Sequence, residues 1–280
     1  MNNTLLQYYC GNCKNILKEI DYEIPSNISI ESCPFCGTLL SDTLQKRSTP
    51  KKQKLEVVFQ RASQFPKLTF GITPLDTCLN FLSTYDKICI TGIETQDIIE
   101  RLCVRAQMSQ RYGGIETKVL LIDGANTTDL YQCVDYAQRY GLDVRKILQG
   151  IISSRTFTVY QIAEIIMHEL ENTIKHYKAK IVIITNLLHF FTKGMFLDSN
   201  EMSQILKQVV KMLQKINDCL IVMTTESPTC FDNMLYKICT KTIKMKYDHD
   251  AVSLEINNNG KKSLIFLKRE EIDTIYVWVK

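Results

Sequence analysis

Short apolar runs alternate with longer segments of helical periodicity through the middle of this chain. The apolar runs are KICIT (87–91), KVLLID (118–123), LQGIIS (148–153), AKIVIIT (179–185) and CLIVMTT (219–225). Apolar residues recur at helical spacing between them, in residues 95–111, 129–140, 158–177 and 201–216. Apolar strands that are each followed by a helix are typical of a parallel sheet with helices on both faces. The sequence therefore predicts an α/β fold built on such a sheet.

The end of the chain follows a different pattern. Four short strand-like segments occur there, KTIKMKYD, AVSLEIN, KKSLIFLK and TIYVWVK, and a polar turn, NNNG (257–260), separates two of them. Short strands joined by tight turns are typical of antiparallel pairing. We expect an antiparallel C-terminal extension of the sheet.

Four cysteines near the start of the chain form two C-x2-C pairs, Cys10 with Cys13 and Cys33 with Cys36. Four thiolates at this spacing bind Zn²⁺ tetrahedrally and leave no open coordination position for catalysis. Two disulfides and a redox C-x-x-C pair are the alternatives, and matched pairs in a short polar segment favour zinc over both. We predict a structural zinc ribbon over residues 1–43.

A basic segment follows at residues 44–54. Its cations are Lys46, Arg47, Lys51, Lys52 and Lys54. Pro50 and the polar composition argue against a helix or strand, so we expect a linker that leads into a core of residues 55–280. The segment is either a solvated tether or a contact to nucleic-acid phosphates, and the two readings are compatible.

The C-terminal strands are also basic. Lys244 and Lys246 lie in the first of them, and Lys261, Lys262 and Lys268 follow further on. Alternate residues of a strand share a face, so these lysines either guard an edge strand against aggregation or form a DNA-binding face.

The bulk composition is that of a soluble globular protein, and we expect no membrane span. The 280 residues are 45% hydrophobic and 23% charged, with a net charge of +4, and they include no long apolar run. The N-terminus shows no secretory signal pattern, so we expect a cytoplasmic protein, with nucleoid association as a further option. The mild positive charge permits an acidic partner without requiring one.

Four stretches in order resemble the RecA/RadA recombinase superfamily, and archaeal RadA-like paralogs in particular. They are FPKLTFGITPLDTCLN (65–80), the strand and helix of 119–148, SSRTFTVYQIAEII (153–166) and IVIITNLLHFF (181–191). The resemblance covers residues 55–280, and it implies a RecA-like ATPase fold, a role in DNA repair or recombination, and DNA or a RadA-type recombinase as partner. A zinc module joined to such a core also resembles the layout of bacterial zinc-finger RadA proteins, although the cysteine spacing here is wider.

The phosphate-binding loop of this superfamily falls at the turn after the strand 87–91. Such a loop needs wrapped backbone N–H groups, a lysine on the phosphates and a hydroxyl on magnesium. This turn has Gly92 but no lysine, and it is acidic at Glu94 and Asp97. Thr95 is the only hydroxyl available, and we expect it to cap the following helix.

Two further parts of the ATPase machinery differ from the superfamily pattern. The glutamate that prepares the attacking water is missing, since Asp123 ends its strand and Gly124, Ala125 and Asn126 follow. Asn186 stands at the position of the magnesium-binding acid. We therefore read Gly92, Thr95, Asp123 and Asn186 as a remnant nucleotide site, assign no catalytic residue, and do not expect ordinary ATP and Mg²⁺ binding.

The favoured hypothesis is a catalytically degenerate RecA/RadA-like paralog with an N-terminal zinc ribbon. It would assist DNA repair or homologous recombination by binding DNA, an active recombinase, or both, and self-association is a further option. Two alternatives stay open. One is an active but unorthodox ATPase around Gly92 and Asp123, and the other is a KaiC-like regulatory scaffold that acts through protein contacts alone.

Overall fold

The structure is a computed structural model that describes residues 4–10, 12, 16–20, 44–50, 67–193, 199–226, 228–249, 251–269 and 272. Contacts divide the chain into two compact units, Met1–Gln64 and Phe65–Lys280. The sequence predicts the core to begin at residue 55, and this boundary stays a prediction because residues 51–66 lie outside the described part.

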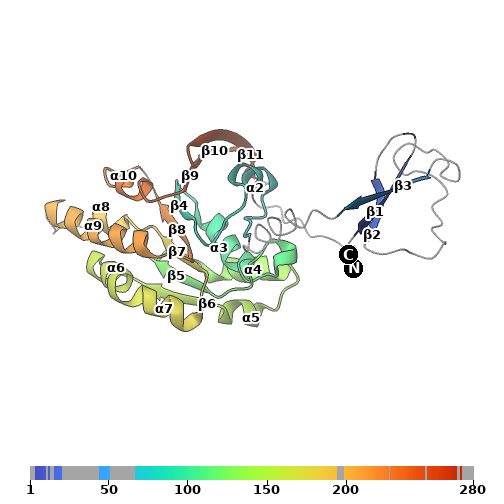
Figure 1. The fold of residues 1–280 in the computed structure, drawn as a ribbon. Coiled ribbons are helices and arrows are strands. Elements are labelled where there is room, and N and C mark those ends of the chain that lie inside the picture. Colours follow the sequence, from blue (N-terminus) through green and yellow to red (C-terminus); the bar gives the residue numbers. More distant parts are fainter. Residues whose placement is uncertain are drawn as a thin grey trace. The chain divides into compact units, whose positions relative to one another are not determined.

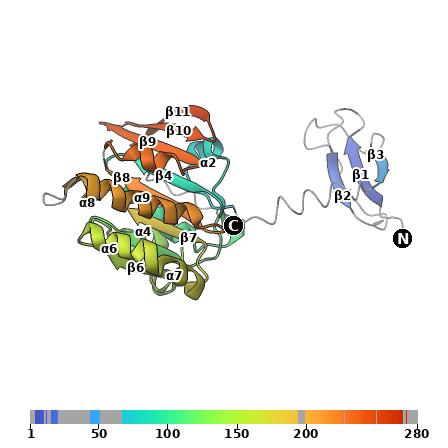
Figure 2. The same ribbon diagram turned by 60° about the vertical axis from the view of Figure 1, so that its left-hand side comes forward.

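The N-terminal unit contains a three-stranded antiparallel sheet (Figure 2). Its strands are β1 (Thr4–Cys10), β2 (Ile16–Ile20) and β3 (Leu44–Pro50), in the order β2-β1-β3. The predicted linker is wrong over residues 44–50, since Lys46 pairs with Tyr8 and Arg47 with Gln7. Pairing with β1 overrides the polar composition, and Pro50 is tolerated because it is the last residue of its strand.

The second unit is built around an eight-stranded sheet whose strands lie in the order β11-β10-β9-β4-β8-β7-β5-β6 (Figure 1). The strands found where apolar runs predict them are β4 (Lys87–Thr91), β5 (Val119–Asp123), β6 (Ile151–Arg155), β7 (Ile181–Thr185) and β8 (Leu220–Thr225). Neighbours among these five strands pair parallel. The predicted parallel α/β sheet is confirmed.

The C-terminal extension is confirmed as well. It consists of β9 (Lys241–Asp248), β10 (Ala251–Asn258) and β11 (Lys261–Lys268), which pair antiparallel with one another. β9 joins the extension to the main sheet by pairing parallel with β4. The fourth expected strand, residues 274–280, lies outside the described residues.

Helices cover both faces of the sheet (Figure 1). One core lies under α2 (Thr73–Leu79), α3 (Gln96–Arg105), α4 (Leu130–Arg139) and α5 (Val144–Gln149). The other lies under α6 (Val159–Glu164), the π-helical turn η2 (Ile165–Glu169), α7 (Leu170–Tyr177), α8 (His189–Lys193), α9 (Ser199–Lys215) and α10 (Asp232–Tyr236). Along β5, Val119 and Leu121 enter the first core while Leu120 and Ile122 enter the second, as the alternation of a strand requires.

Two boundaries differ from the prediction. The expected strand at 148–153 begins only at Ile151, because the Asp143 carboxylate accepts hydrogen bonds from the N–H groups of Arg145 and Lys146 and starts α5 there. The expected helix at 95–111 ends at Arg105, and a separate 3-10 turn, η1 (Gln110–Tyr112), follows it. Among the described residues, no helix is long and apolar enough to cross a membrane.

Candidate functional site

The carboxyl ends of the parallel strands form the edge where sheets of this type bind ligands. Buried polar side chains gather at this edge, and they come from the ends of four strands and the turns that follow them. They are Thr91, Thr95, Asp123, Thr128, Thr185, Asn186, Thr224 and Thr225. Three of the four predicted nucleotide-site residues, Thr95, Asp123 and Asn186, are among them.

The Asp123 carboxylate is engaged by the turn that follows β5. One oxygen accepts hydrogen bonds from the N–H groups of Ala125 and Thr127 at 3.3 and 3.2 Å, and from the Thr185 hydroxyl at 3.0 Å. The other oxygen accepts from the Thr128 N–H at 3.0 Å. The predicted end of the strand at Asp123 is confirmed, and its carboxylate serves to hold the turn and to tie β5 to β7.

Asn186, which the sequence predicts to stand at the position of the magnesium-binding acid, is equally engaged. Its backbone N–H donates to the Thr224 hydroxyl at 2.9 Å, and its side-chain oxygen accepts from the same hydroxyl at 3.3 Å. Its side-chain N–H donates to the Thr127 hydroxyl at 3.1 Å. A neutral carboxamide is suited to this network because it both donates and accepts, whereas a carboxylate only accepts.

The turn at Gly92 packs against β9. The Gly92 N–H donates to the Thr225 carbonyl at 2.9 Å, and a Cβ added at Gly92 would lie 2.5 Å from the Met245 carbonyl oxygen. The Tyr247 hydroxyl donates to the Glu94 carbonyl at 3.2 Å, while Arg269 lies 3.3 Å from the Glu94 carboxylate. These contacts hold the loop through the C-terminal extension.

Thr95 does not have its predicted role. It occupies the N-cap position of α3, but its backbone is already helical, with φ −75° and ψ −9°, and its side chain makes no cap hydrogen bond. The physical reason is that a capping side chain needs an extended backbone to turn back toward the N–H groups of the first turn. Thr95 is instead a buried residue, 2% exposed.

Glu100 is a buried acid beside this edge that sequence reasoning missed. One carboxylate oxygen accepts the Asp129 N–H at 2.8 Å, and the other accepts no hydrogen bond from the described residues. Burial, aided by the charges of Asp97, Asp129 and Asp123, raises its pKa to about 7. Nothing in the helical pattern of α3 marks Glu100, because the helix is buried on several sides.

The predicted DNA-contacting cations fall in different units. Lys46 and Arg47 lie in β3, while Lys51, Lys52 and Lys54 fall outside the described residues. Lys244 and Lys246 are exposed on β9. β9 pairs with β4 on one side and β10 on the other, so edge protection does not account for these two lysines.

The predicted zinc ligands also lie largely outside the description. Cys10 is the last residue of β1, and Cys13, Cys33 and Cys36 lie outside the described residues. The described part of the chain holds no cluster of three or more metal-ligating side chains. Zinc binding stays a prediction.

The fold and its strand-end site define a RecA-like domain, and comparison with known proteins agrees. A family model described as Rad51 matches residues 66–230, so the chain belongs to the Rad51 family within the RecA/RadA superfamily. It is 27% identical over 197 residues to the DNA repair and recombination protein RadA of Metallosphaera sedula. The alignment covers 62% of this chain and 56% of that relative, so the chain spans just over half of the relative's length. The predicted superfamily is confirmed.

Proposed function

We propose that this chain is a RadA-like paralog without ordinary ATPase activity. It assists DNA repair or homologous recombination by binding DNA, an active recombinase, or both. The match to the Rad51 family and the similarity to a DNA repair and recombination protein support a role in repair or recombination. The main support for the absence of ATPase activity is the hydrogen-bond network at the strand ends. There the side chains of Asp123 and Asn186 are already hydrogen-bonded within the protein. Their partners are Thr127, Thr128, Thr185 and Thr224.

Phosphoryl transfer depends on charge placed around the phosphates and on a magnesium ion held by oxygen ligands. At this edge the turn has no lysine to bind phosphates, and it is acidic at Glu94 and Asp97. The charges of Asp97, Asp123 and Asp129 already oppose ionisation of Glu100 and would oppose a bound triphosphate in the same way. Both features argue against nucleotide binding.

Ligand-dependent thermal stability tests this part of the proposal. A ligand at about 100 times its Kd stabilises a protein by about 2.7 kcal/mol, which raises the Tm by several degrees. We expect the same Tm with MgCl2 alone, with ATP and EDTA, and with excess MgATP. A magnesium-dependent rise in Tm that disappears in Asp123→Asn would instead overturn the pseudoenzyme reading and favour the unorthodox ATPase.

Salt dependence tests the DNA-binding part. Contacts to phosphates release counterions, so the affinity for DNA falls steeply as salt rises. We expect such a fall in fluorescence anisotropy titrations with labelled oligonucleotides. If the chain binds a RadA-type recombinase but no DNA at low salt, the regulatory scaffold becomes the correct function.

A further inference from the structure

The C-terminal extension has one face in the core and one face toward solvent. Ile243 and Met245 of β9, Val252 and Leu254 of β10, and Leu267 of β11 lie in the first core. The residues that alternate with them form the opposite surface, which we call the lysine face. Its members are Thr242, Lys244 and Lys246 of β9, Ser253, Glu255 and Asn257 of β10, and Lys262, Leu264, Phe266 and Lys268 of β11.

Strand pairing arranges the lysine face in rows. One row runs Lys246, Ser253, Phe266 and the next runs Lys244, Glu255, Leu264. A third row runs Thr242, Asn257, Lys262. Lysines therefore stand on both outer strands, β9 and β11. The middle strand, β10, contributes a polar side chain to each row, namely Ser253, Glu255 and Asn257. Neighbouring strands lie about 4.8 Å apart, so the two outer strands are about 10 Å from one another, and their lysines stand in different rows.

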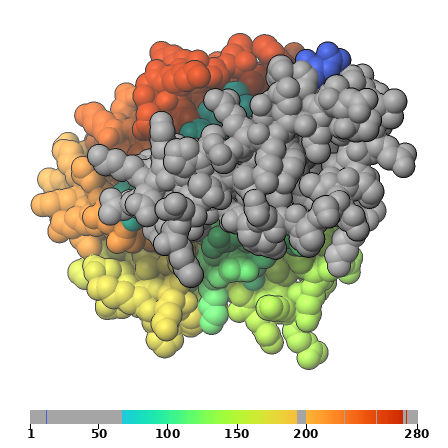
Figure 3. Space-filling view, turned by 45° about the vertical axis from the view of Figure 1, so that its right-hand side comes forward, coloured from blue at the N-terminus to red at the C-terminus, as the bar shows by residue number. Residues whose placement is uncertain are grey.

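The face is hollowed and exposed. A groove of about 690 Å³ is lined by residues that include Tyr236, Lys244, Glu255, Asn257 and Lys262. Phe266 is 70% exposed and Leu264 is 56% exposed, an uncommon state for large apolar side chains on one strand. Figure 3 shows β10 and β11 in red along the top of the view, on the outside of the second unit.

The Lys246 ammonium group is available to a ligand. It lies 3.4 Å from the Glu255 carboxylate, and both side chains are more than half exposed, at 71% and 52%. An exposed ion pair of this kind contributes little and exchanges readily for a stronger anion. Lys244 Nζ stands 5.8 Å from the centre of the Tyr236 ring, which places its charge on the wall of the groove.

We propose that the lysine face binds single-stranded DNA, with phosphates along Lys244 and Lys246 and a base stacked on Phe266. This rests on the proposed function in so far as that function includes DNA. Sheet faces that bind single strands combine cations with exposed aromatic rings on which unpaired bases stack. A duplex offers no free base to Phe266, which favours the single strand. Lysine and glutamate are depleted from protein–protein interfaces, and this disfavours a protein as occupant.

Two variants separate the two contacts in anisotropy titrations of the full chain with labelled oligo(dT). Phe266→Ala should weaken binding roughly ten-fold with an unchanged salt dependence, because it removes stacking alone. Lys244→Ala with Lys246→Ala should weaken binding and lower the slope of log affinity against log salt by about 1.4, because each phosphate contact to a single strand contributes about 0.7. Oligo(dT) should bind more tightly than a duplex of the same length.

Matched controls lie on other surfaces of the same unit. Lys207→Ala with Lys211→Ala removes two exposed lysines of α9, and Phe157→Ala removes a ring that is 64% exposed after β6. Both should bind like the wild type. Circular dichroism spectra and unfolding midpoints that match the wild type should accompany the Phe266 and lysine variants.

The outcomes distinguish this inference from the proposed function. If the wild type binds oligo(dT) but the Phe266 and lysine variants match it, DNA binding stands and the assignment of this face is wrong. Tighter binding of a duplex or of oligo(rU) also overturns it. If no DNA binds and Phe266→Ala impairs binding to a RadA-type recombinase, the face is a protein-docking surface and the inference fails.

Discussion

Glu100 illustrates what a single buried residue does to this domain. It is 1% exposed, and among the described residues its carboxylate accepts one hydrogen bond, from the N–H of Asp129, the N-cap of α4. The pKa of its carboxyl rises from 4.5 to about 7 because burial disfavours the charged form. The folded protein therefore holds this proton up to about pH 7, while the unfolded chain releases it near pH 4.5.

Between these two values the folded state binds more protons, so the free energy of unfolding falls as the pH rises. A shift of this size corresponds to about 3 kcal/mol, present below pH 4.5 and lost by about pH 7. Glu100→Gln cannot ionise. We expect it to abolish this component of the pH dependence and to stabilise the protein at pH 8, measured by urea unfolding across the pH range.

Glu169→Gln, an exposed glutamate at the end of the π-helical turn, is the control and should retain the wild-type pH profile. If Glu100→Gln keeps the full decline in stability between pH 4.5 and 7, then Glu100 is not the group that titrates in this window.

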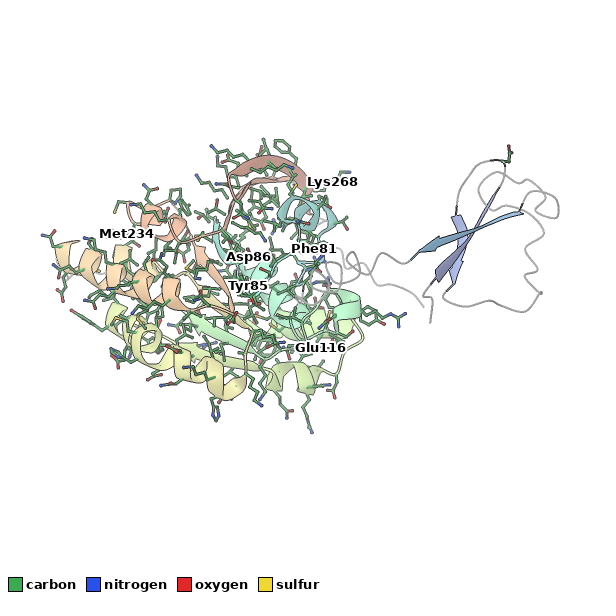
Figure 4. The ribbon with its side chains drawn as sticks, in the orientation of Figure 1. Phe81, Tyr85, Asp86, Glu116, Met234 and Lys268 are labelled. Atoms are coloured by element: carbon green, nitrogen blue, oxygen red, sulfur yellow. The ribbon has the colours of Figure 1, made fainter. Side chains whose placement is uncertain are left out.

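At the scale of secondary-structure elements, a buried ion pair lies where β9 joins β4. Lys241 Nζ lies 2.6 Å from the Asp86 carboxylate and donates to the Phe81 carbonyl at 2.7 Å. Asp86 also accepts from the Ser83 N–H and the Thr240 hydroxyl. Figure 4 labels Phe81 and Asp86 near the start of β4. Burial raises the pKa of Asp86, but the hydrogen bonds from Lys241 and Ser83 outweigh it and leave the pKa below its usual 3.8.

Lys241→Met should destabilise the second unit by about 3–5 kcal/mol at neutral pH, because it leaves the Asp86 carboxylate buried without its cation. Combining it with Asp86→Asn should recover much of the loss in urea unfolding. Lys244→Met, an exposed lysine on the same strand, serves as the control and should change stability by less than about 0.5 kcal/mol. An equal loss in the single and double variants would show that the pair is not coupled.

Because the folded pKa of Asp86 is depressed, its contribution to stability is present above about pH 3.8 and is lost as the pH falls below that value. It therefore changes with pH in the opposite direction to the contribution of Glu100.

At the scale of the whole molecule, the chain divides into two units of very different size, Met1–Gln64 and Phe65–Lys280. The unit Phe65–Lys280 has two extensive apolar cores, one on each face of its sheet. The unit Met1–Gln64 is small, and a single core of this size supplies little stability, which natural small domains often supplement with disulfides or a structural metal. We propose that Cys10, Cys13, Cys33 and Cys36 hold one structural Zn²⁺ ion, whose binding free energy stabilises the N-terminal unit.

Metal analysis of the purified chain should find about one zinc per chain, and Cys10→Ser with Cys33→Ser should remove it. Limited proteolysis of that variant should then degrade the N-terminal unit while the second unit persists, because the cores of the second unit contain none of these cysteines. Cys78→Ser with Cys230→Ser, two cysteines of the second unit, should retain zinc. Full zinc content in the Cys10 and Cys33 variant would contradict the assignment.

Features encoded by neighbouring residues could be predicted from the sequence. The five central strands, the antiparallel extension and helix α4 all follow from local periodicity. The absence of a lysine from the turn after β4 could likewise be read along the chain. These features need no knowledge of distant residues, since each one lies within a single strand, helix or turn.

Only the tertiary structure decided which polar groups face one another. Residues 44–50 form a strand because β1 pairs with them. The strand prediction failed at 148–150 because α5, which starts after the Asp143 cap, continues to Gln149 and ends at its C-cap Gly150. Asn186 hydrogen-bonds to Thr224, which is 38 residues away in the sequence, and Asp86 pairs with Lys241, which is 155 residues away. Cross-strand hydrogen bonds and burial depend on which strands become neighbours. That order is set by the packing of the whole sheet, and no local pattern carries it.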